Sequence, residues 1–235
     1  MCLLESLAYK FWNSLNLPSW MLKPSDQHTC YCILCRNRKT NAAYHGRPLQ
    51  LYILPHDWFL FRVNPRVPIG QSLQDILRTW HICYHGTDAG NLMSILRIGL
   101  RIPGDTDLYG RRITERIGHY NDYNKPYGFD TKRIFVSPSI KYAGCDAYAH
   151  ARCYRNWFTG CTYRVKVSLQ VRIRPESYYV GGSTIAIQSI DPLYDDDEIE
   201  WSTALRNTHV VTGVLVRFER YQCTGHPHGW TCWTF

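Results

Sequence analysis

The chain has 235 residues, of which 45% are hydrophobic and 20% are charged. This composition is typical of a folded globular protein, and it excludes a disordered or collagen-like chain. Lysine and arginine outnumber aspartate and glutamate by 27 to 19, a net charge of +8, which suits nucleic acid, an anionic membrane surface or a phosphate-bearing small molecule without choosing among them.

The first 25 residues predict one short amphipathic helix that packs on the surface of the fold and is closed by Lys23-Pro24-Ser25. Glu5 interrupts the apolar run, and no basic leader precedes it, so the segment does not have the pattern of a signal peptide. No stretch of 18 uncharged apolar residues occurs, so we expect no membrane-spanning helix and no membrane partner. Without an export signal, most of the ten cysteines are expected to be free thiols or metal ligands.

A cysteine cluster with the spacing C-x-C-x-x-C follows, made by Cys30, Cys32 and Cys35. With His45 as the fourth ligand, three thiolates and one imidazole would complete a tetrahedral, structural zinc site. His28 is also nearby, and a looser tail group could supply the missing ligand instead: Cys223, His226, His228 and Cys232. The alternative interpretation is three free thiols in a turn.

Strands dominate the rest of the chain. Residues 51–63 favour strand or extended edge structure around Pro55. Strands are predicted at 80–84, at 163–173, where strict alternation indicates one buried face, and at 210–218, where a nearly continuous apolar run indicates burial on both faces. We therefore predict an α+β fold with few helices.

One helix is predicted between the first two of these strands. Thr87 or Asp88 can cap its start, and an apolar face recurs at helical spacing. Gly99 can end it in the left-handed conformation. The apolar face is made by Leu92, Ile95 and Leu96.

Three blocks in this region resemble the ADP-ribosyltransferase catalytic domain, in the branch shared by poly(ADP-ribose) polymerases and diphtheria toxin. The first block is the strand ending Tyr84-His85-Gly86-Thr87, followed by the helix that ends Ser-Ile-Leu-x-x-Gly-Leu. The second block, residues 134–143, is a strand and a short helix that ends in Tyr-Ala. The third block is Glu198-Ile199-Glu200-Trp201, just before the late strand. The resemblance covers about residues 80–220.

The upstream cysteine cluster, residues 44–48 and Trp58 are similar to the C-terminal region of neuralized-like proteins and of related bacterial effectors. These likenesses imply an ADP-ribosyltransferase-like split β-sheet as the catalytic core at 80–221. Residues 1–79 would be an N-terminal extension packed on that core, and residues 222–235 a tail.

The resemblance implies that NAD⁺ is the substrate and lies between two small sheets. His85 would bond a ribose hydroxyl, the Gly86 backbone would clamp the nicotinamide carboxamide, and Thr87 would support the histidine. Glu200 would stabilise the positive charge that builds on the sugar as the nicotinamide bond breaks. Glu198, two residues away, would share its strand face and position or deprotonate the acceptor. The alternative is a solvated acidic loop that continues from Asp195, Asp196 and Asp197.

The second block would supply the aromatic wall of the pocket. Ser139 lies three residues before Tyr142, the spacing of the serine and stacking tyrosine in poly(ADP-ribose) polymerases. Tyr142 is therefore the expected stacking residue, and Tyr148 is the reserve candidate. Ser137 would line the pocket beside them, and Phe135 stands where the polymerase pattern has tyrosine, which keeps an aromatic wall but removes a hydroxyl. Core packing is the alternative for both tyrosines.

The implied function is mono-ADP-ribosylation of a protein side chain, with ubiquitin as the first acceptor to test because neuralized-like proteins belong to ubiquitin ligation. The loop at 103–130 holds Arg111, Arg112, Arg116 and Lys125, with Arg101 just before it. These basic residues would meet the pyrophosphate, or the loop would be solvated and recognise the acceptor. Two alternatives remain open: an inactive module of the same fold that binds protein or, less favoured, RNA, and an NAD⁺ glycohydrolase. The expected location is the cytoplasm or nucleus, with delivery into a host cell as an effector also open.

Overall fold

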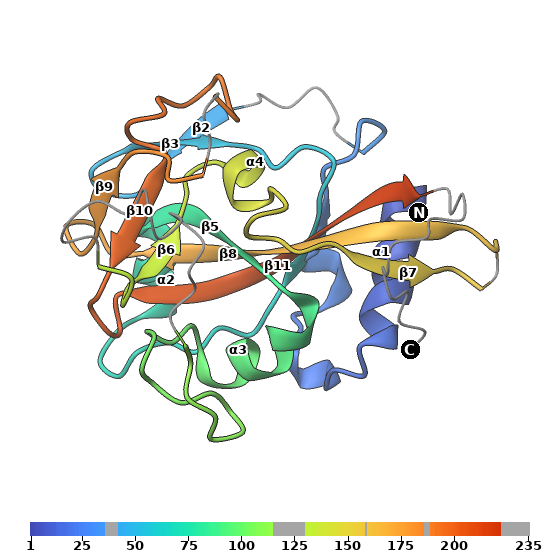
Figure 1. Ribbon diagram of the computed structural model, residues 1–235, viewed down its shortest axis with the longest axis horizontal. Coiled ribbons are helices and arrows are strands. Elements are labelled where there is room, and N and C mark those ends of the chain that lie inside the picture. The colour runs from blue at the N-terminus through green and yellow to red at the C-terminus, as the bar shows by residue number, and fades with distance from the viewer. Residues whose placement is uncertain (36–41, 115–129, 158, 186–188, 222–235) are drawn as a thin grey trace.

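The computed structural model describes residues 1–35, 42–114, 130–157, 159–185 and 189–221 (Figure 1). Its helices and strands are, in chain order, α1 (Leu3–Ser14), β1 (Thr29–Cys30), β2 (Ala42–His45), β3 (Gln50–Ile53), β4 (Phe59–Arg62), α2 (Leu73–Thr79), β5 (His81–Thr87), α3 (Leu92–Ile98), β6 (Ile134–Val136), α4 (Ile140–Ala143), β7 (Arg152–Arg155), β8 (Thr162–Ile173), β9 (Tyr179–Gly181), β10 (Glu200–Thr203) and β11 (His209–Tyr221).

The main sheet has the order β1-β4-β11-β8-β5, with β7 paired to the first residues of β8, and all of its pairs are antiparallel. A three-stranded antiparallel sheet, β6-β10-β9, lies beside it, and β2 and β3 form a separate hairpin. The long strands β8 and β11 run through the centre of the molecule in Figure 1. The predicted α+β class with few helices is confirmed.

The main sheet is covered on both faces. On one face, α1 and α3 pack against the odd-numbered residues of β8 in the larger core cluster, which contains Phe11 and Leu92. On the other, α4 and the β2–β3 hairpin pack against β5 in a second cluster, which contains Tyr52 and Ile140. This second layer places α4, and the tyrosines near it, against β5.

This second layer corrects one prediction about β8. The strand lies where its alternation predicts, but its polar face is buried too, with Ser168 and Gln170 almost fully inaccessible. Gln170 accepts a hydrogen bond of 2.7 Å from Arg62, and Ser168 donates one of 3.2 Å to the His85 carbonyl. Polar side chains can be buried there because each finds a partner.

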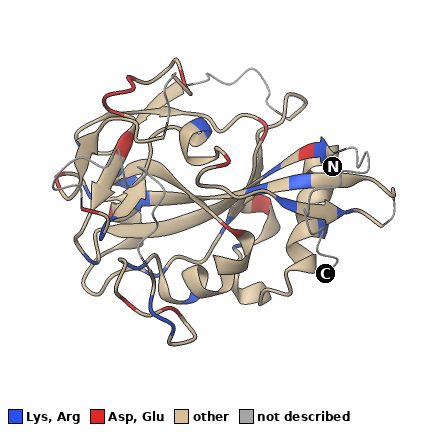
Figure 2. Cartoon of the chain, viewed as in Figure 1, with Lys and Arg blue, Asp and Glu red and all other residues tan. Residues whose placement is uncertain are grey.

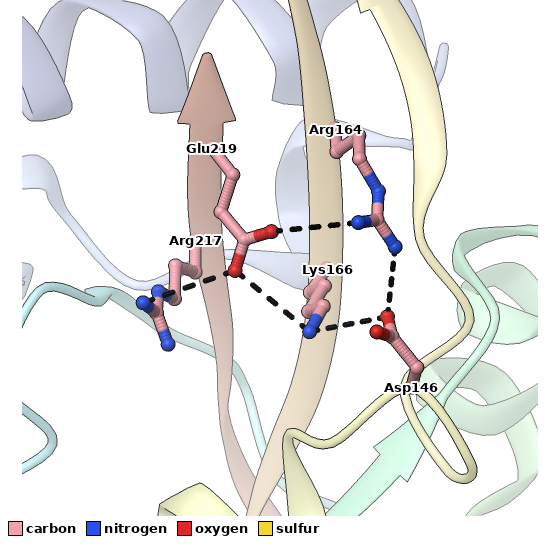
Figure 3. A network of polar contacts seen from close by, with 5 residues as sticks. All are labelled: Asp146, Arg164, Lys166, Arg217 and Glu219. Carbon is pink, nitrogen blue, oxygen red and sulfur yellow. Dashed lines mark hydrogen bonds and ion pairs between the residues drawn. The ribbon is translucent and has the colours of Figure 1, made fainter. Parts of the chain in front are cut away.

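Near the N-terminal end of β8, a network of ion pairs lies on the polar face (Figure 3). Lys166 of β8 lies 3.1 Å from Asp146 and 3.8 Å from Glu219, and Arg164 and Arg217 complete the group. Figure 2 shows several basic residues at this end of the sheet. The network ties β8 and β11 to the segment between α4 and β7.

The predicted boundary at residue 79 does not separate two structural units. Strand β4 lies between β1 and β11 inside the main sheet, so the stretch around Pro55 leads into an interior strand and not an edge. Helix α1 ends at Ser14 and buries Leu7 and Phe11 in the main core. Residues 1–79 are therefore part of the core and not an extension packed on it.

The remaining predicted elements agree with the structure. Strand β5 begins one residue later than predicted and continues to Thr87, and β11 extends its predicted range at both ends and is buried on both faces over most of its length. Helix α3 ends at Gly99, whose φ is +82°, and Asp88 caps the short 3-10 turn that precedes the helix. Within the described parts of the chain, each helix is too short or too polar to cross a bilayer.

Candidate functional site

The two sheets meet where β5 passes β6. Tyr84 and Ser137 exchange backbone hydrogen bonds of 2.7 and 2.9 Å at a single isolated bridge. Beside this bridge lies a cavity of about 500 Å³. Its lining includes most of the residues predicted to bind the substrate, namely His85, Gly86, Thr87, Phe135, Ser137, Tyr142, Tyr148 and Glu200.

Glu200 is the buried acidic group of this cavity. It is the first residue of β10, and only 5% of it is exposed. One of its carboxylate oxygens accepts hydrogen bonds from the hydroxyls of Tyr148 at 2.8 Å, Tyr142 at 3.0 Å and Thr184 at 3.0 Å. Three donors from two other segments thus orient the carboxylate before any ligand arrives.

The two tyrosines differ in exposure. Tyr142 in α4 is 1% exposed, whereas Tyr148 is half-buried, and their rings lie 5.4 Å apart with a 49° tilt. Burial, followed by the nearby Glu200 charge, raises the pKa of both phenols above the usual value. Both therefore remain protonated donors around neutral pH, and Tyr148 is the more accessible residue.

His85 is oriented by the second sheet. Its Nδ1 lies 2.8 Å from the Phe135 carbonyl of β6. A carbonyl only accepts, so Nδ1 carries the proton and the neutral ring has Nε2 as its acceptor. The backbone of β6 thus sets the tautomer of a cavity-lining histidine on β5.

Gly86 is required by close packing. A Cβ at this position would overlap the Ala143 carbonyl and lie 2.7 Å from the Tyr148 Cβ. The segment from α4 to Tyr148 can therefore rest against the β5 backbone only because residue 86 has no side chain. Thr87, next in the strand, is buried and accepts a hydrogen bond of 3.4 Å from Asn91.

Two predicted site residues do not line the cavity. Ser139 is fully buried as the N-cap of α4, accepts the Tyr142 N–H at 3.2 Å and donates to Asp191 at 2.6 Å. Glu198 is exposed in a turn, where its backbone N–H donates to the Asp195 carbonyl at 3.1 Å. The expectation that Glu198 shares a strand face with Glu200 is wrong, because β10 begins only at Glu200.

Sequence reasoning missed two supporting residues. Thr184 lies in the segment between β9 and β10, bonds Glu200 through its hydroxyl and donates its N–H to the Tyr142 oxygen at 3.0 Å. Asp191 is 2% exposed and also accepts from Lys141 at 3.2 Å. Neither belongs to a motif or a periodic stretch, so nothing in the local sequence marks them.

Basic side chains form part of the cavity wall. Arg101, Arg111 and Arg112, predicted to meet a pyrophosphate, line it, and so does Arg133 of the segment before β6. Arg111 is also paired with Asp107 at 2.8 Å. The other basic residues of the predicted loop, Arg116 and Lys125, lie outside the described residues.

A second candidate site is a group of four thiols that could hold a metal ion. The sulfur atoms of Cys2, Cys30, Cys32 and Cys35 all lie within 4.8 Å of one another. The predicted fourth ligand was wrong: His45 lies on β2 with its ring against Tyr52, and the fourth member is Cys2.

His28, the other histidine considered as a ligand, is not a member of this thiol cluster. His28 Nδ1 accepts the Arg62 backbone N–H at 3.2 Å. The tail group, Cys223, His226, His228 and Cys232, lies outside the described residues.

The thiols of this cluster differ in acidity. Burial is the main cause that raises the pKa of Cys30, and the neighbouring Cys2 thiol raises that of Cys35 to about 11. Desolvation also acts on Cys32, but hydrogen bonds from the Cys35 backbone and from neighbouring thiols outweigh it and lower the pKa of Cys32 to about 7. Cys32 therefore deprotonates before Cys30 and Cys35.

The first site joins a buried, oriented carboxylate to a histidine of fixed tautomer, an accessible aromatic ring and arginines. Such a cavity can bind a ligand that has planar rings, hydroxyls and anionic groups, and can stabilise positive charge next to Glu200. No protein-family model matches the chain.

Proposed function

We propose that this protein is a mono-ADP-ribosyltransferase of the split-sheet type, which moves ADP-ribose from NAD⁺ to a protein side chain and releases nicotinamide. One observation carries the proposal. His85, the two tyrosines and Glu200 come from three distant segments, and all line the cavity between two antiparallel sheets. The arginines of the wall suit the pyrophosphate of the same substrate.

Glu200 would carry the chemical step. The bond from the ribose C1′ to nicotinamide breaks, its electron pair leaves with nicotinamide, and positive charge builds on the sugar. A fixed carboxylate stabilises that charge more than it stabilises the neutral ribose, which lowers the barrier. The acceptor atom then forms a bond to C1′ and loses its proton. Tyr142, Tyr148 and Thr184 act as positioning residues that hold the carboxylate.

The remaining lining residues would bind and orient NAD⁺. His85 Nε2 can accept a hydrogen bond from a ribose hydroxyl, and the Gly86 backbone can pair with the carboxamide. Between the two tyrosines, the half-buried Tyr148 has the ring surface that stacking on nicotinamide needs, and Tyr142 has almost none. The aromatic wall is therefore assigned to Tyr148, with Phe135 near it.

A second candidate is NAD⁺ glycohydrolase, and the position of Glu198 favours keeping it. A second carboxylate on the strand would have favoured transfer, but Glu198 is exposed in the preceding turn and does not line the cavity. If water is the acceptor, no such group is needed. The same assay distinguishes transfer to a protein acceptor, with ubiquitin tested first, from an inactive module that binds protein or RNA.

The test combines NAD⁺ binding, nicotinamide release and protein labelling in one preparation. Labelled NAD⁺ is incubated with the protein, alone, with ubiquitin and with a cell lysate, and labelled proteins are identified by mass spectrometry. Label transfer with nicotinamide release supports the transferase, and release without labelling supports the glycohydrolase. Binding without release would leave an inactive module, and absence of NAD⁺ binding would overturn the proposal.

We also propose that the ion suited to the thiol cluster is zinc in a structural role. Soft thiolates select zinc over hard cations, and four protein ligands close the coordination sphere. None of the four cysteines lines the cavity, so the ion would support the fold and take no part in the reaction.

A further inference from the structure

The ligand set of the thiol cluster spans two elements that are distant in the sequence. Cys30 is the last residue of β1, and Cys32 and Cys35 lie in the turn that follows it. Cys2 is the N-cap residue of α1. An ion bound by all four would therefore connect the first helix to an edge strand of the main sheet through metal–sulfur bonds.

The sulfur positions suit one tetrahedral ion. Four sulfurs bound at about 2.3 Å lie roughly 3.8 Å apart. Here the Cys2 sulfur is 3.4 Å from Cys30 and 3.6 Å from Cys32. The turn from Cys32 to Cys35 is closed by a backbone hydrogen bond of 3.1 Å, which brings the last two sulfurs to the same side.

The first turn of α1 contacts the Cys2 sulfur. The Glu5 N–H donates to the Cys2 sulfur at 3.4 Å. Unpaired N–H groups and the helix dipole at this end of a helix suit a ligand atom that carries negative charge, as a zinc-bound sulfur does.

Helix α1 has an apolar attachment of its own further along. Leu7, Phe11 and Trp12 are almost fully buried, and the Trp12 ring lies 4.8 Å from that of Phe61 on β4. These contacts hold the middle of the helix, whereas Leu3 beside Cys2 is exposed. A 12-residue helix is marginal without tertiary support, so its first turn depends on what fixes its N-terminal end.

We propose that Cys2, Cys30, Cys32 and Cys35 form a four-thiolate zinc centre and that this centre fastens the N-terminal end of α1 to the main sheet. Binding releases the thiol protons and forms four zinc–sulfur bonds, without any change of oxidation state. Removing zinc loosens the first turns of α1 and leaves the β5–β8–β11 part of the sheet folded. This inference does not depend on the enzymatic proposal.

The first experiment measures thiol reactivity by alkylation and mass spectrometry. Cys35 is exposed, so without a metal its sulfur is accessible to iodoacetamide. We expect protein purified without chelator to hold about one zinc per chain and to protect all four cysteines, and EDTA to expose them. Cys145 and Cys161, which lie outside the cluster, should react equally before and after EDTA. No zinc with EDTA-independent alkylation, or a disulfide within the cluster, would overturn the centre.

The second experiment tests the role of Cys2. Cys2→Ser should lose zinc to a competing chelator at least about tenfold more readily than the parent chain, because even the loss of an outer-shell partner costs 10–100-fold in affinity. His45→Ala and Cys161→Ser are matched controls that should retain zinc like the parent. If His45→Ala loses zinc and Cys2→Ser does not, the ligand assignment is wrong.

Hydrogen exchange then separates fastening from folding. In EDTA, and in Cys2→Ser, amides of residues 3–8 should lose most of their protection, whereas amides of β8 and β11 should exchange somewhat faster, as the lower global stability requires, but remain protected. Unchanged exchange in α1 after zinc is lost would overturn the fastening role. Complete loss of protection throughout the chain would also overturn it, because the whole fold would then require the centre.

Discussion

The thiol cluster takes three of its four members from six consecutive residues, whereas the cavity takes His85, Tyr142 and Glu200 from segments far apart in the chain. The two sites also differ in what their residues do for one another. The thiols converge on a single point that a metal can fill, and the cavity groups are already hydrogen-bonded around a carboxylate. The thiol cluster is therefore expected to serve stability and the cavity to serve chemistry. Variants of the cluster should change mainly the unfolding free energy, and variants of the cavity mainly the reaction rate.

The largest effect is expected from Glu200→Gln. The amide keeps the size of the side chain and can still accept from the tyrosines, but it lacks the charge that the transition state needs. We expect nicotinamide release to fall by about 10²–10³, or roughly 3–4 kcal/mol. The thermal midpoint and NAD⁺ affinity should stay close to the parent values.

The matched control for this variant is Glu198→Gln, which changes a carboxylate two residues away in the exposed turn. Equal rates for Glu200→Gln and the parent chain would show that Glu200 is not catalytic. A large loss of thermal stability in Glu200→Gln would instead show that the buried carboxylate is a structural group, and the cavity would then serve stability as the thiol cluster does.

The next effect is expected from Cys30→Ser, on stability alone. Zinc contributes roughly 10–16 kcal/mol to the folding of small zinc-binding peptides, so loss of one of four ligands is expected to remove about 3 kcal/mol. Chemical denaturation would measure the loss, and nicotinamide release per folded molecule should not change. A Cys161→Ser control should be near neutral. A Cys30→Ser chain as stable as the parent would argue against a structural metal.

A smaller effect is expected from Asp191→Ala, which connects the cavity to its support. Asp191 is buried and accepts from Ser139 and Lys141, so its loss leaves the proton of the buried Ser139 hydroxyl without an acceptor at the start of α4. We expect a loss of about 2 kcal/mol in unfolding free energy. Nicotinamide release should fall as well, because α4 carries Tyr142. Asp195→Ala, in the exposed turn, is the control, and equal behaviour of the two variants would contradict the positioning role.

The smallest effect is expected from Glu198→Ala. The side chain is exposed, so stability should change by less than about 0.5 kcal/mol and nicotinamide release by less than about twofold. Protein labelling is the informative measurement. A selective loss of labelling would place the acceptor over this turn, and loss of nicotinamide release would mean that the turn closes onto the cavity.

The sequence predicted the elements whose pattern is local. The alternation over 163–173 placed β8, the apolar run over 210–218 placed β11, and Gly99 marked the end of α3. The cavity residues around His85 and Glu200 were also named from the sequence, through a family resemblance. The supporting partners were not, because Thr184 and Asp191 lie in irregular segments where neither period nor spacing carries a signal.

The sequence by itself determined the α+β class, the long central strands and three of the four clustered thiols, because each depends on the spacing of neighbouring residues. The tertiary structure alone decided that β4 enters the main sheet, that Cys2 and not His45 joins the thiols, and that Glu200 is buried while Glu198 is exposed. The physical reason is the same in each case. Which strand pairs with which, and where a strand begins, depends on contacts between segments far apart in the chain, and a pattern within one segment does not contain that information.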